Sequence, residues 1–363
     1  MANNRVLSTG NDAIAAAAIA AGCRFYAGYP ITPQNEIPAY MARHMPEASG
    51  IFIQAESELS AINMVFGASA SGARAMTSSS SPGISLKQEG ISYIAGAQLP
   101  AVIVNMMRAG PGLGGIAPAQ SDYFQATRGG GHGDYRCIVL APANVQEAHD
   151  FTMQAFALAD KYRCPAIILG DGMLGQMMEP LLVRSKINKI PVKKWALTGA
   201  KGRSVNLIAS FRMREEDLEK LNLNLQKKYK IIQQRQQRWE SLSLEGAKII
   251  LVAYGTMSRI AKSAVVALRK KGILAGLIRP ITLWPFPVQA FQQLTINDKQ
   301  LTILAIEMSY GQMAEDVRLA INGKYPVEFL GRAGGGIPSE EEIIKKVIEI
   351  GLLVSKLKRG ARR

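Results

Sequence analysis

The regular alternation of short apolar runs with amphipathic helical patterns constrains this chain more than any other feature. The runs AVIVNMM (101–107) and CPAIILGDG (164–172) are apolar on both faces, as is typical of strands in a parallel sheet covered by helices. Helical patterns such as VQEAHDFTMQAFALADKY (145–162) lie between such runs. The alternation predicts an α/β fold with a doubly wound parallel sheet over roughly residues 5–175.

The alternation stops near residue 180 and returns at residue 247, which predicts two α/β domains joined by a linker. At 363 residues the chain is long enough to bury two cores. We assign residues 1–182 to the first domain, 183–245 to a basic linker and 246–363 to a second, smaller domain. Within the linker, the charged stretch 215–242 predicts one long helix.

Composition narrows the class of protein. Hydrophobic residues make up 48% of the chain and charged residues 20%, which fits a globular enzyme rather than a disordered or fibrous protein. The cysteines Cys23, Cys137 and Cys164 are scattered singly, so we expect no iron–sulfur cluster or structural zinc held by this chain alone. No apolar run of about 20 residues and no signal-peptide pattern is present, so we expect a cytoplasmic location.

The formal net charge of +15 gathers in a few places, chiefly residues 184–203, 226–238 and the tail 356–363. A solvated surface is the simplest interpretation of these runs. An acidic protein partner steered by the field and a nucleic acid are the functional alternatives. Aromatic residues make up only 7% of the chain and do not interleave with the basic runs, so nucleic acid is the weaker alternative.

Glu58 raises a question about the stretch FIQAESELSAINMVFGASASG. A carboxylate on a packed helix face costs several kcal/mol unless it is paired or hydrogen-bonded. The neighbouring acid Glu56 leads to a more polar face, as expected of an acid in a first helical turn. Glu58, by contrast, is in line with small and apolar residues at helical spacing, namely Ala61, Ile62, Val65 and Ser69. We therefore expect a partner for the Glu58 carboxylate.

Several loops follow predicted strands, where a parallel sheet places its ligands. GYPITP (28–33) presents Thr32 between two prolines that stiffen the turn. TSSSSPG (77–83) puts small hydroxyl residues at another strand end, and Arg108 ends the run AVIVNMM as a lone cation. A cation there suits a carboxylate or phosphate ligand, although a salt bridge is an equal alternative.

Three further motifs are weaker. GPGLGG (110–115) matches the dinucleotide fingerprint formally, but no Ala-rich helix follows it, so an active-site loop is favoured. GDG (170–172) resembles the start of the diphosphate-binding motif of thiamine enzymes, but the Asn pair that completes a magnesium site is missing, so Asp171 is interpreted as a strand-end residue. His132 lies in a glycine-rich loop and is interpreted as a mobile polar contact at most.

Taken together, these motifs resemble the 2-oxoacid:ferredoxin oxidoreductases. The segments concerned are GYPITPQNEI, QAESELSAINMVFGA, MTSSSSPGISLKQEGISY, NMMRAGPGLGG and GGGHGDY. The resemblance is to the alpha subunit, with a thiamine diphosphate pyrimidine-binding domain followed by a smaller transketolase-C-like domain. It is strongest toward the 2-oxoisovalerate (3-methyl-2-oxobutanoate) and 2-oxoglutarate types. In the C-terminal part, GTMSR, IRPITLWPFP and IEMSYGQM carry it.

The resemblance implies roles for particular residues. Glu58 matches the glutamate that shares a proton with a ring nitrogen of the cofactor's aminopyrimidine, which lets the ring take the proton of the thiazolium carbon. Thr32 matches the threonine at the carbonyl or carboxylate end of the substrate. Arg108 matches an arginine that binds the substrate carboxylate or helps coenzyme A. No metal ligand is implied on this chain. The remaining residues expected at the cofactor are Pro30, Ile31, Ser81 and Gly83.

The resemblance also implies partners and a reaction. Diphosphate and magnesium binding are expected on a beta subunit, and the 4Fe-4S clusters on partner subunits that include a ferredoxin-like delta chain; a gamma chain is also expected. The implied reaction is the coenzyme A-dependent oxidative decarboxylation of a 2-oxoacid to acyl-CoA and carbon dioxide, with electrons passed to ferredoxin. It is reversible in principle, and the sequence leaves the 2-oxoacid open.

Three alternatives stay open at this point. The chain could belong to another thiamine diphosphate enzyme of the transketolase-like or E1-like kind. It could be a non-catalytic basic module that binds nucleic acid through residues 184–240, which salt would weaken. It could also be a nicotinamide-dependent dehydrogenase that uses GPGLGG.

Overall fold

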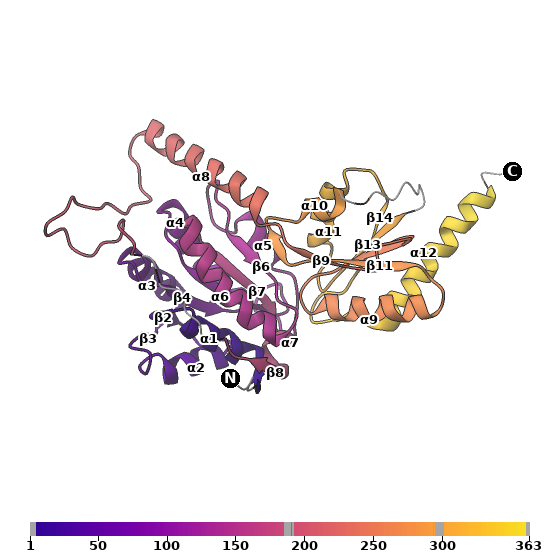
Figure 1. Cartoon of the computed structure of the whole chain (residues 1–363), viewed down its shortest axis with the longest axis horizontal. Coiled ribbons are helices and arrows are strands. Elements are labelled where there is room, and N and C mark those ends of the chain that lie inside the picture. The colour runs from indigo at the N-terminus through magenta and orange to yellow at the C-terminus, as the bar shows by residue number, and fades with distance from the viewer. Residues whose placement is uncertain (1–4, 185–189, 191, 293, 295–300, 361–363) are drawn as a thin grey trace.

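The structure is a computed structural model that describes residues 5–184, 190, 192–292, 294 and 301–360. Figure 1 shows two α/β domains side by side, with the long helix α8 (Glu215–Arg235) lying across the first. Two predicted basic runs fall partly outside the description, because residues 185–189, 191 and 361–363 and the side chains from residue 353 onward are not described.

The first domain is built on a seven-stranded sheet, and its parallel order confirms the predicted doubly wound fold. The spatial order is β12–β6–β7–β5–β4–β2–β3, and every neighbouring pair is parallel except β12–β6. The strands are β2 (Phe25–Gly28), β3 (Ile51–Gln54), β4 (Ala75–Ser79), β5 (Val102–Met107), β6 (Ile138–Leu140), β7 (Ala166–Asp171) and β12 (Thr282–Trp284). Strands β4, β5, β6 and β7 are buried throughout, as their continuous apolar or small residues require.

The second domain has a five-stranded sheet in the order β14–β13–β10–β11–β9. Four of its strands run parallel, and β9 pairs antiparallel with β11 at the edge. The strands are β9 (Trp239–Leu242), β10 (Ile249–Val252), β11 (Ala275–Pro280), β13 (Thr302–Glu307) and β14 (Val327–Gly331).

The strand β9 corrects the prediction of one helix over residues 215–242. Helix α8 ends at Arg235, and residues 239–242 are extended. The half-buried Trp239 packs against the core, and the strand pairs with β11, so long-range pairing overrides the helical pattern. The predicted domain limits stay a prediction. Strand pairing crosses them, because β9 of the predicted linker joins the second sheet and β12 of the predicted second domain joins the first.

A second antiparallel pair joins the N-terminal strand β1 (Arg5–Thr9) to β8 (Met178–Leu182). The remaining helices lie around the sheets (Figure 1). They are α1 (Gly10–Ala20), α2 (Glu36–His44), α3 (Glu58–Ala70), α4 (Ser81–Gly96), α5 (Tyr123–Arg128), α6 (Val145–Tyr162), α7 (Gly172–Gln176), α9 (Met257–Lys270), α10 (Val288–Gln292), α11 (Gln312–Ile321) and α12 (Glu340–Gly360).

Buried hydrogen bonds hold the two domains together. The Gln120 amide donates to the Tyr254 carbonyl at 3.0 Å and accepts from the Met308 backbone N–H at 3.0 Å. Asp171 caps α7 and also accepts a hydrogen bond from the Thr256 hydroxyl. This agrees with its interpretation as a strand-end residue.

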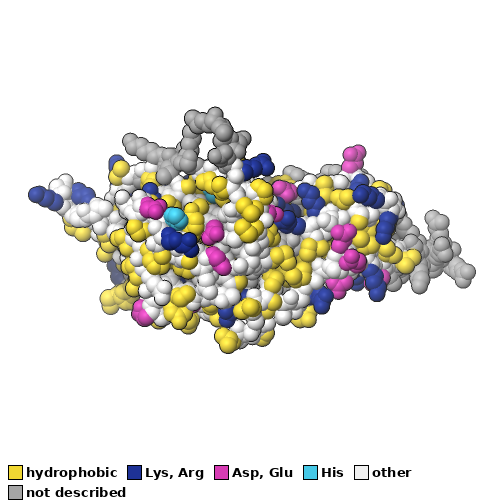
Figure 2. Space-filling view, turned by 90° about the horizontal axis from the view of Figure 1, so that it is seen from below, with side chains coloured by type: hydrophobic (Ala, Val, Ile, Leu, Met, Phe, Trp, Pro, Cys, Tyr) yellow, Lys and Arg dark blue, Asp and Glu magenta, His cyan; other side chains and the backbone are white. Residues whose placement is uncertain are grey.

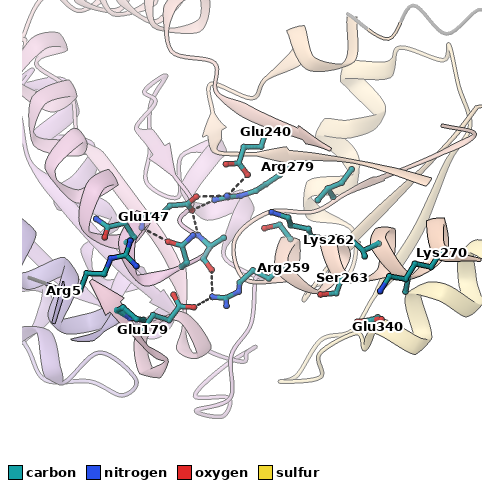
Figure 3. A pocket seen from close by; sticks show the side chains of 18 residues that line it. Arg5, Glu147, Glu179, Glu240, Arg259, Lys262, Ser263, Lys270, Arg279 and Glu340 are labelled. Carbon is teal, nitrogen blue, oxygen red and sulfur yellow. Dashed lines mark hydrogen bonds and ion pairs between the residues drawn. The ribbon is translucent and has the colours of Figure 1, made fainter. Parts of the chain in front are cut away.

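Ion pairs line a cavity of about 960 Å³ between the domains (Figure 3). Arg279 pairs with Glu147 of α6 and with Glu240 of β9. Arg259 of α9 pairs with Glu179 of β8 at 2.7 Å. The pairs Arg279–Glu147 and Arg259–Glu179 each join a residue of one domain to a residue of the other.

Figure 2 shows one face of the molecule, on which charged side chains of both signs lie on both halves and hydrophobic side chains are interspersed with uncharged polar atoms. No helix among the described residues is long and apolar enough to cross a membrane.

Candidate active site

The carboxyl ends of β2, β4 and β5 lie at one edge of the first sheet, called here the carboxyl edge. Thr32 follows β2, Ser81 begins α4 directly after β4, and Arg108 follows β5. Since β5, β4 and β2 are neighbours in the sheet, the folded chain brings these three residues to one place. Glu58 reaches the same place from the first residue of α3.

Glu58 is buried, with an exposed fraction of 5%. The packed stripe expected of its helix is present, because Ala61, Ile62, Val65 and Ser69 are all fully buried. Ser57 caps α3 by accepting a hydrogen bond from the Ser60 N–H at 3.2 Å, which starts the helix at Glu58. The side chain thus enters the protein from a helix N-terminus, where the helix dipole favours a negative charge.

The carboxylate of Glu58 lies against α4. A Cβ built on Gly83 would overlap Glu58 Oε1 and Ser79 Oγ, so only glycine leaves room for the carboxylate there. Among the described residues, none donates a hydrogen bond to this carboxylate. Because burial of an unpaired carboxylate is costly, a ligand that donates a hydrogen bond to Glu58 would stabilise this site.

Glu56 has a different environment. Its side chain is exposed and accepts a hydrogen bond from the Ser60 hydroxyl, which lowers the pKa of Glu56. The structure therefore places the two acids as the helical spacing predicts, with Glu58 inside and Glu56 in solvent.

Arg108 is 8% exposed and bonded to both neighbouring loops. Its Nη1 donates to the Thr32 carbonyl and its Nη2 to the Leu113 carbonyl, each at 3.1 Å. The backbone N–H of Arg108 donates to Ser81 Oγ at 3.0 Å, and Ser81 Oγ donates to Asp122 at 2.6 Å. These bonds tie Thr32, Ser81 and Arg108 into one network. The Nε of Arg108 has no hydrogen-bond partner among the described residues.

The YPITP turn projects from the carboxyl edge. Pro30 and Thr32 are exposed and Ile31 is half-buried, so all three can face a bound molecule. The Thr32–Pro33 peptide bond is cis, and the Thr32 hydroxyl accepts a weak hydrogen bond of 3.4 Å from Asn35.

The site fits a ring that carries hydrogen-bonding groups. Ser79 and Ser80 are fully buried, and neither hydroxyl has a partner among the described residues. They lie with Gly83 around the start of α4, next to the Glu58 carboxylate. Buried hydroxyls normally find partners, so these orphaned groups point to a ligand with donors and acceptors of its own.

Three polar residues at this edge were not predicted, the buried Gln34 and Lys87 and the half-buried Asp122. Gln34 holds Ser78 by a hydrogen bond, and Asp122 accepts from Ser81 and from Asn105. Burial raises the pKa of Asp122. Lys87, on α4, donates to the Glu58 carbonyl at 3.3 Å. Lys87 lies four residues after Gly83 on the same helix face, but its burial depends on how closely α3 and α4 pack, which the sequence does not reveal.

The structure gives GPGLGG and His132 surroundings unlike those of a dinucleotide-binding motif. GPGLGG forms a loop whose Leu113 side chain is 81% exposed, and the next helix begins only at Tyr123. The loop contributes a carbonyl to Arg108, as an active-site loop would. His132 is exposed, and its ring packs edge-on against Tyr93.

Comparison with known proteins decides the family. Residues 16–228 match the family described as pyruvate flavodoxin/ferredoxin oxidoreductase, thiamine diphosphate-binding. Residues 247–343 match core domain II of pyruvate:ferredoxin oxidoreductase. This chain belongs to the 2-oxoacid:ferredoxin oxidoreductase family. It is therefore a subunit of an oxidoreductase that uses thiamine diphosphate.

Individual members of the 2-oxoacid:ferredoxin oxidoreductase family are similar over most of their length. The ketoisovalerate oxidoreductase subunit VorB of Methanothermobacter marburgensis is 51% identical over 94% of this chain and 96% of its own. The 2-oxoglutarate synthase subunit KorA of Methanothermobacter thermautotrophicus is 37% identical over 94% of this chain and 97% of its own. Because these relatives are named as subunits, the chain belongs to a multi-subunit complex.

A solved structure has the same fold. The 2-oxoglutarate:ferredoxin oxidoreductase of Magnetococcus marinus, with 2-oxoglutarate, coenzyme A and succinyl-CoA bound, superposes with a TM-score of 0.86 at 26% identity. The superposition covers 96% of this chain and 65% of that one. The family assignment removes the nicotinamide and nucleic-acid alternatives as descriptions of the whole chain.

Proposed function

We propose that this chain is the alpha subunit that holds the aminopyrimidine of thiamine diphosphate in a 2-oxoacid:ferredoxin oxidoreductase specific for a branched-chain 2-oxoacid such as 2-oxoisovalerate. The reaction is the oxidative decarboxylation of the 2-oxoacid with coenzyme A to acyl-CoA and carbon dioxide, and ferredoxin takes the electrons. The observation that carries the proposal is the buried Glu58 carboxylate, without a donor among the described residues, beside Gly83.

The residues of the carboxyl edge fit this role. When bound, thiamine diphosphate supplies a nucleophilic carbon and an electron sink. Glu58 would share its proton with a ring nitrogen, because a carboxyl group in a dry site holds such a hydrogen bond strongly. Gly83 leaves room for that contact, and Ser81 orients the start of α4 through Asp122. Pro30 and Ile31 would flank the ring from the YPITP turn.

Thr32 and Arg108 would hold the substrate. Both lie in one hydrogen-bonded network, and the Arg108 guanidinium keeps unused N–H donors, among them Nε. A guanidinium binds a carboxylate through two parallel hydrogen bonds, so Arg108 suits the carboxylate of a 2-oxoacid. The Thr32 hydroxyl, which is exposed, is free to donate to the 2-oxo oxygen.

A cavity beside Thr32 favours a branched aliphatic substrate over 2-oxoglutarate. Its volume is about 540 Å³, and its lining contains one acid and no lysine or arginine among the described residues. The second carboxylate of 2-oxoglutarate would need a cation there, whereas an isopropyl group needs only apolar contacts. The lining residues are Thr32, Pro33, Glu36, Ile116, Pro118, Gly172, Met173 and Gln176.

The proposed partners are a beta subunit with the diphosphate and magnesium site, a gamma subunit, and a ferredoxin-like delta subunit with 4Fe-4S clusters. Exposed apolar side chains in the linker support burial against another chain. Val205, Leu207, Phe211 and Met213 are 75–87% exposed, and no acid occurs between residues 180 and 214. An acidic partner surface would suit this segment. A cytoplasmic location stays a prediction.

The substrate assignment is tested with the assembled complex. This chain is co-expressed with its candidate beta, gamma and delta subunits, and the purified complex is assayed for coenzyme A-dependent viologen reduction. We expect kcat/KM for 2-oxoisovalerate to exceed that for 2-oxoglutarate by at least about tenfold, because a misplaced carboxylate lacks a partner. A preference for 2-oxoglutarate contradicts the substrate assignment. A complex that contains thiamine diphosphate and clusters but oxidises no 2-oxoacid contradicts the reaction.

A further inference from the structure

Lys87 is a fully buried lysine on α4, next to the candidate active site. Its exposed fraction is 0%, and its Nζ donates a hydrogen bond of 3.3 Å to the backbone carbonyl of Glu58. A lysine is almost never fully buried unless it is paired, because its ammonium loses its hydration. Lys87 therefore needs a reason to lie where it does.

The packing of α4 against α3 directs Lys87 toward Glu58. Gly83 and Gly90 lie four residues before and three residues after Lys87, on the same face of the helix. A Cβ built on Gly83 would overlap Glu58 Oε1, and one built on Gly90 would lie 2.5 Å from Ile62 of the same α3. The two glycines bring the helices close, and Lys87 spans the contact between them.

The electrostatics of Lys87 depend on Glu58. Burial lowers the pKa of Lys87 from 10.5 to about 8, and the charge of Glu58 opposes this shift. Glu58 is thus an ionisable group whose charge favours the protonated form of Lys87. The ammonium contacts the carbonyl of Glu58 rather than its carboxylate, so the carboxylate stays available to a ligand.

We propose that Lys87 is a positioning residue for Glu58: its ammonium anchors the first residue of α3 and balances the charge of the Glu58 carboxylate. This proposal rests on the proposed function of Glu58 at the thiamine ring. Opposite charges stabilise each other in a buried site. The ammonium of Lys87 thus favours movement of the shared proton from the Glu58 carboxyl to the ring nitrogen, and it is not itself consumed.

The test compares Lys87→Met with Lys87→Arg in the assembled complex. Lys228→Met is the matched control, because Lys228 is a partly buried lysine whose Nζ also donates to a backbone carbonyl, that of Arg163, and whose pKa is lowered by burial. For each protein, kcat and KM for 2-oxoisovalerate are measured from about pH 6 to about pH 10. The same range is used for the unfolding of the isolated chains.

We expect Lys87→Met to lower kcat at neutral pH by roughly tenfold, since a positioned proton transfer loses its balancing charge, with little change in KM. Wild-type kcat should fall as pH rises through about 8, where Lys87 loses its proton. Lys87→Met should lack this fall. Lys87→Arg keeps the charge at every pH tested, so it should restore kcat and also lack the fall.

The pH dependence of the free energy of unfolding tests the titration of Lys87 without an activity assay. Between the folded pKa of about 8 and the unfolded value near 10.5, the unfolded chain holds a proton at Lys87 that the folded chain lacks. Raising the pH through this window therefore stabilises the folded wild-type chain relative to Lys87→Met. Lys228→Met should keep wild-type kcat and its fall near pH 8.

Two results would overturn the proposal: wild-type kcat and pH profile in Lys87→Met, or an equal loss of kcat in Lys228→Met. If Lys87→Met does not fold, Lys87→Arg decides, because an alkaline fall that persists in it contradicts the role of Lys87. A wild-type complex that oxidises no 2-oxoacid refutes the proposed function instead. The difference in unfolding between wild type and Lys87→Met above pH 8 then still tests whether Lys87 is buried as a titrating group beside Glu58.

Discussion

Two places with buried charges, the junction between the domains and the carboxyl edge, differ in their surroundings. At the junction between the domains, Arg279 is 5% exposed, and its Nη1 and Nη2 are both bonded to acids. At the carboxyl edge, Glu58 is also 5% exposed, yet none of the described residues donates to its carboxylate. Two nearby buried hydroxyls, those of Ser79 and Ser80, have no partner among the described residues either.

Charged groups whose partners lie within the protein stabilise the fold, whereas buried polar groups without such partners are available to a ligand. Burial opposes the charge of Arg279, but the hydrogen bonds and charges of Glu147 and Glu240 together outweigh it and raise the pKa of Arg279. At the carboxyl edge, burial dominates and raises the pKa of Asp122 and lowers that of Lys87. A site whose polar groups the fold itself leaves unsatisfied is stabilised when a ligand binds.

The largest effect is expected from Glu58→Gln. The amide keeps the shape but cannot exchange a proton, so viologen reduction by the assembled complex should fall about 10²–10⁴-fold. The free energy of unfolding should fall less in this variant than in Arg279→Leu, because none of the described residues donates to this carboxylate and only the ammonium of Lys87 loses its balancing charge. Urea unfolding of the same variant checks this. A variant that loses stability while it keeps its activity would assign Glu58 to the fold.

The reverse pattern is expected from Arg279→Leu. Removing this guanidinium leaves Glu147 and Glu240 without their shared cation, and breaking a buried pair costs roughly 3 kcal/mol. We expect the urea midpoint to fall and kcat at a permissive temperature to stay within about twofold. The double variant Arg279→Leu, Glu147→Leu should recover part of the stability. An unchanged midpoint with lost activity would place Arg279 in the active site.

The sequence predicts one of these two places better than the other. Strand periodicity and the helical phase of Glu58 are local, so the sheet and the buried acid could be predicted. The junction could not, because β9 and β12 pair with strands far away in the chain, and Arg279 meets its acids only through those pairings. Lys87 was missed for the same reason: its burial depends on how closely α3 and α4 pack.

Gly83→Ala tests how closely the carboxyl edge fits Glu58. The new methyl group would overlap Glu58 Oε1 and Ser79 Oγ, so the carboxylate must turn away. Overpacking of this kind costs about 1–3 kcal/mol, and we expect a loss of kcat of roughly tenfold. Gly67→Ala is the control, because a Cβ there has nothing within 4 Å and lies on the same pair of helices. Equal activity in the two variants would show that the carboxylate needs no defined position.

The smallest effect is expected from Glu56→Gln, two residues from Glu58. Glu56 is exposed and its main partner is the Ser60 hydroxyl, to which a glutamine oxygen can still bond. Its charge lies in solvent, where salt and water screen its interaction with the helix start. We therefore expect viologen reduction within about twofold of wild type and a nearly unchanged urea midpoint. A large loss of activity in Glu56→Gln, with normal activity in Glu58→Gln, would exchange the roles of the two acids, because both lie within one helical turn of the carboxyl edge and only burial distinguishes them.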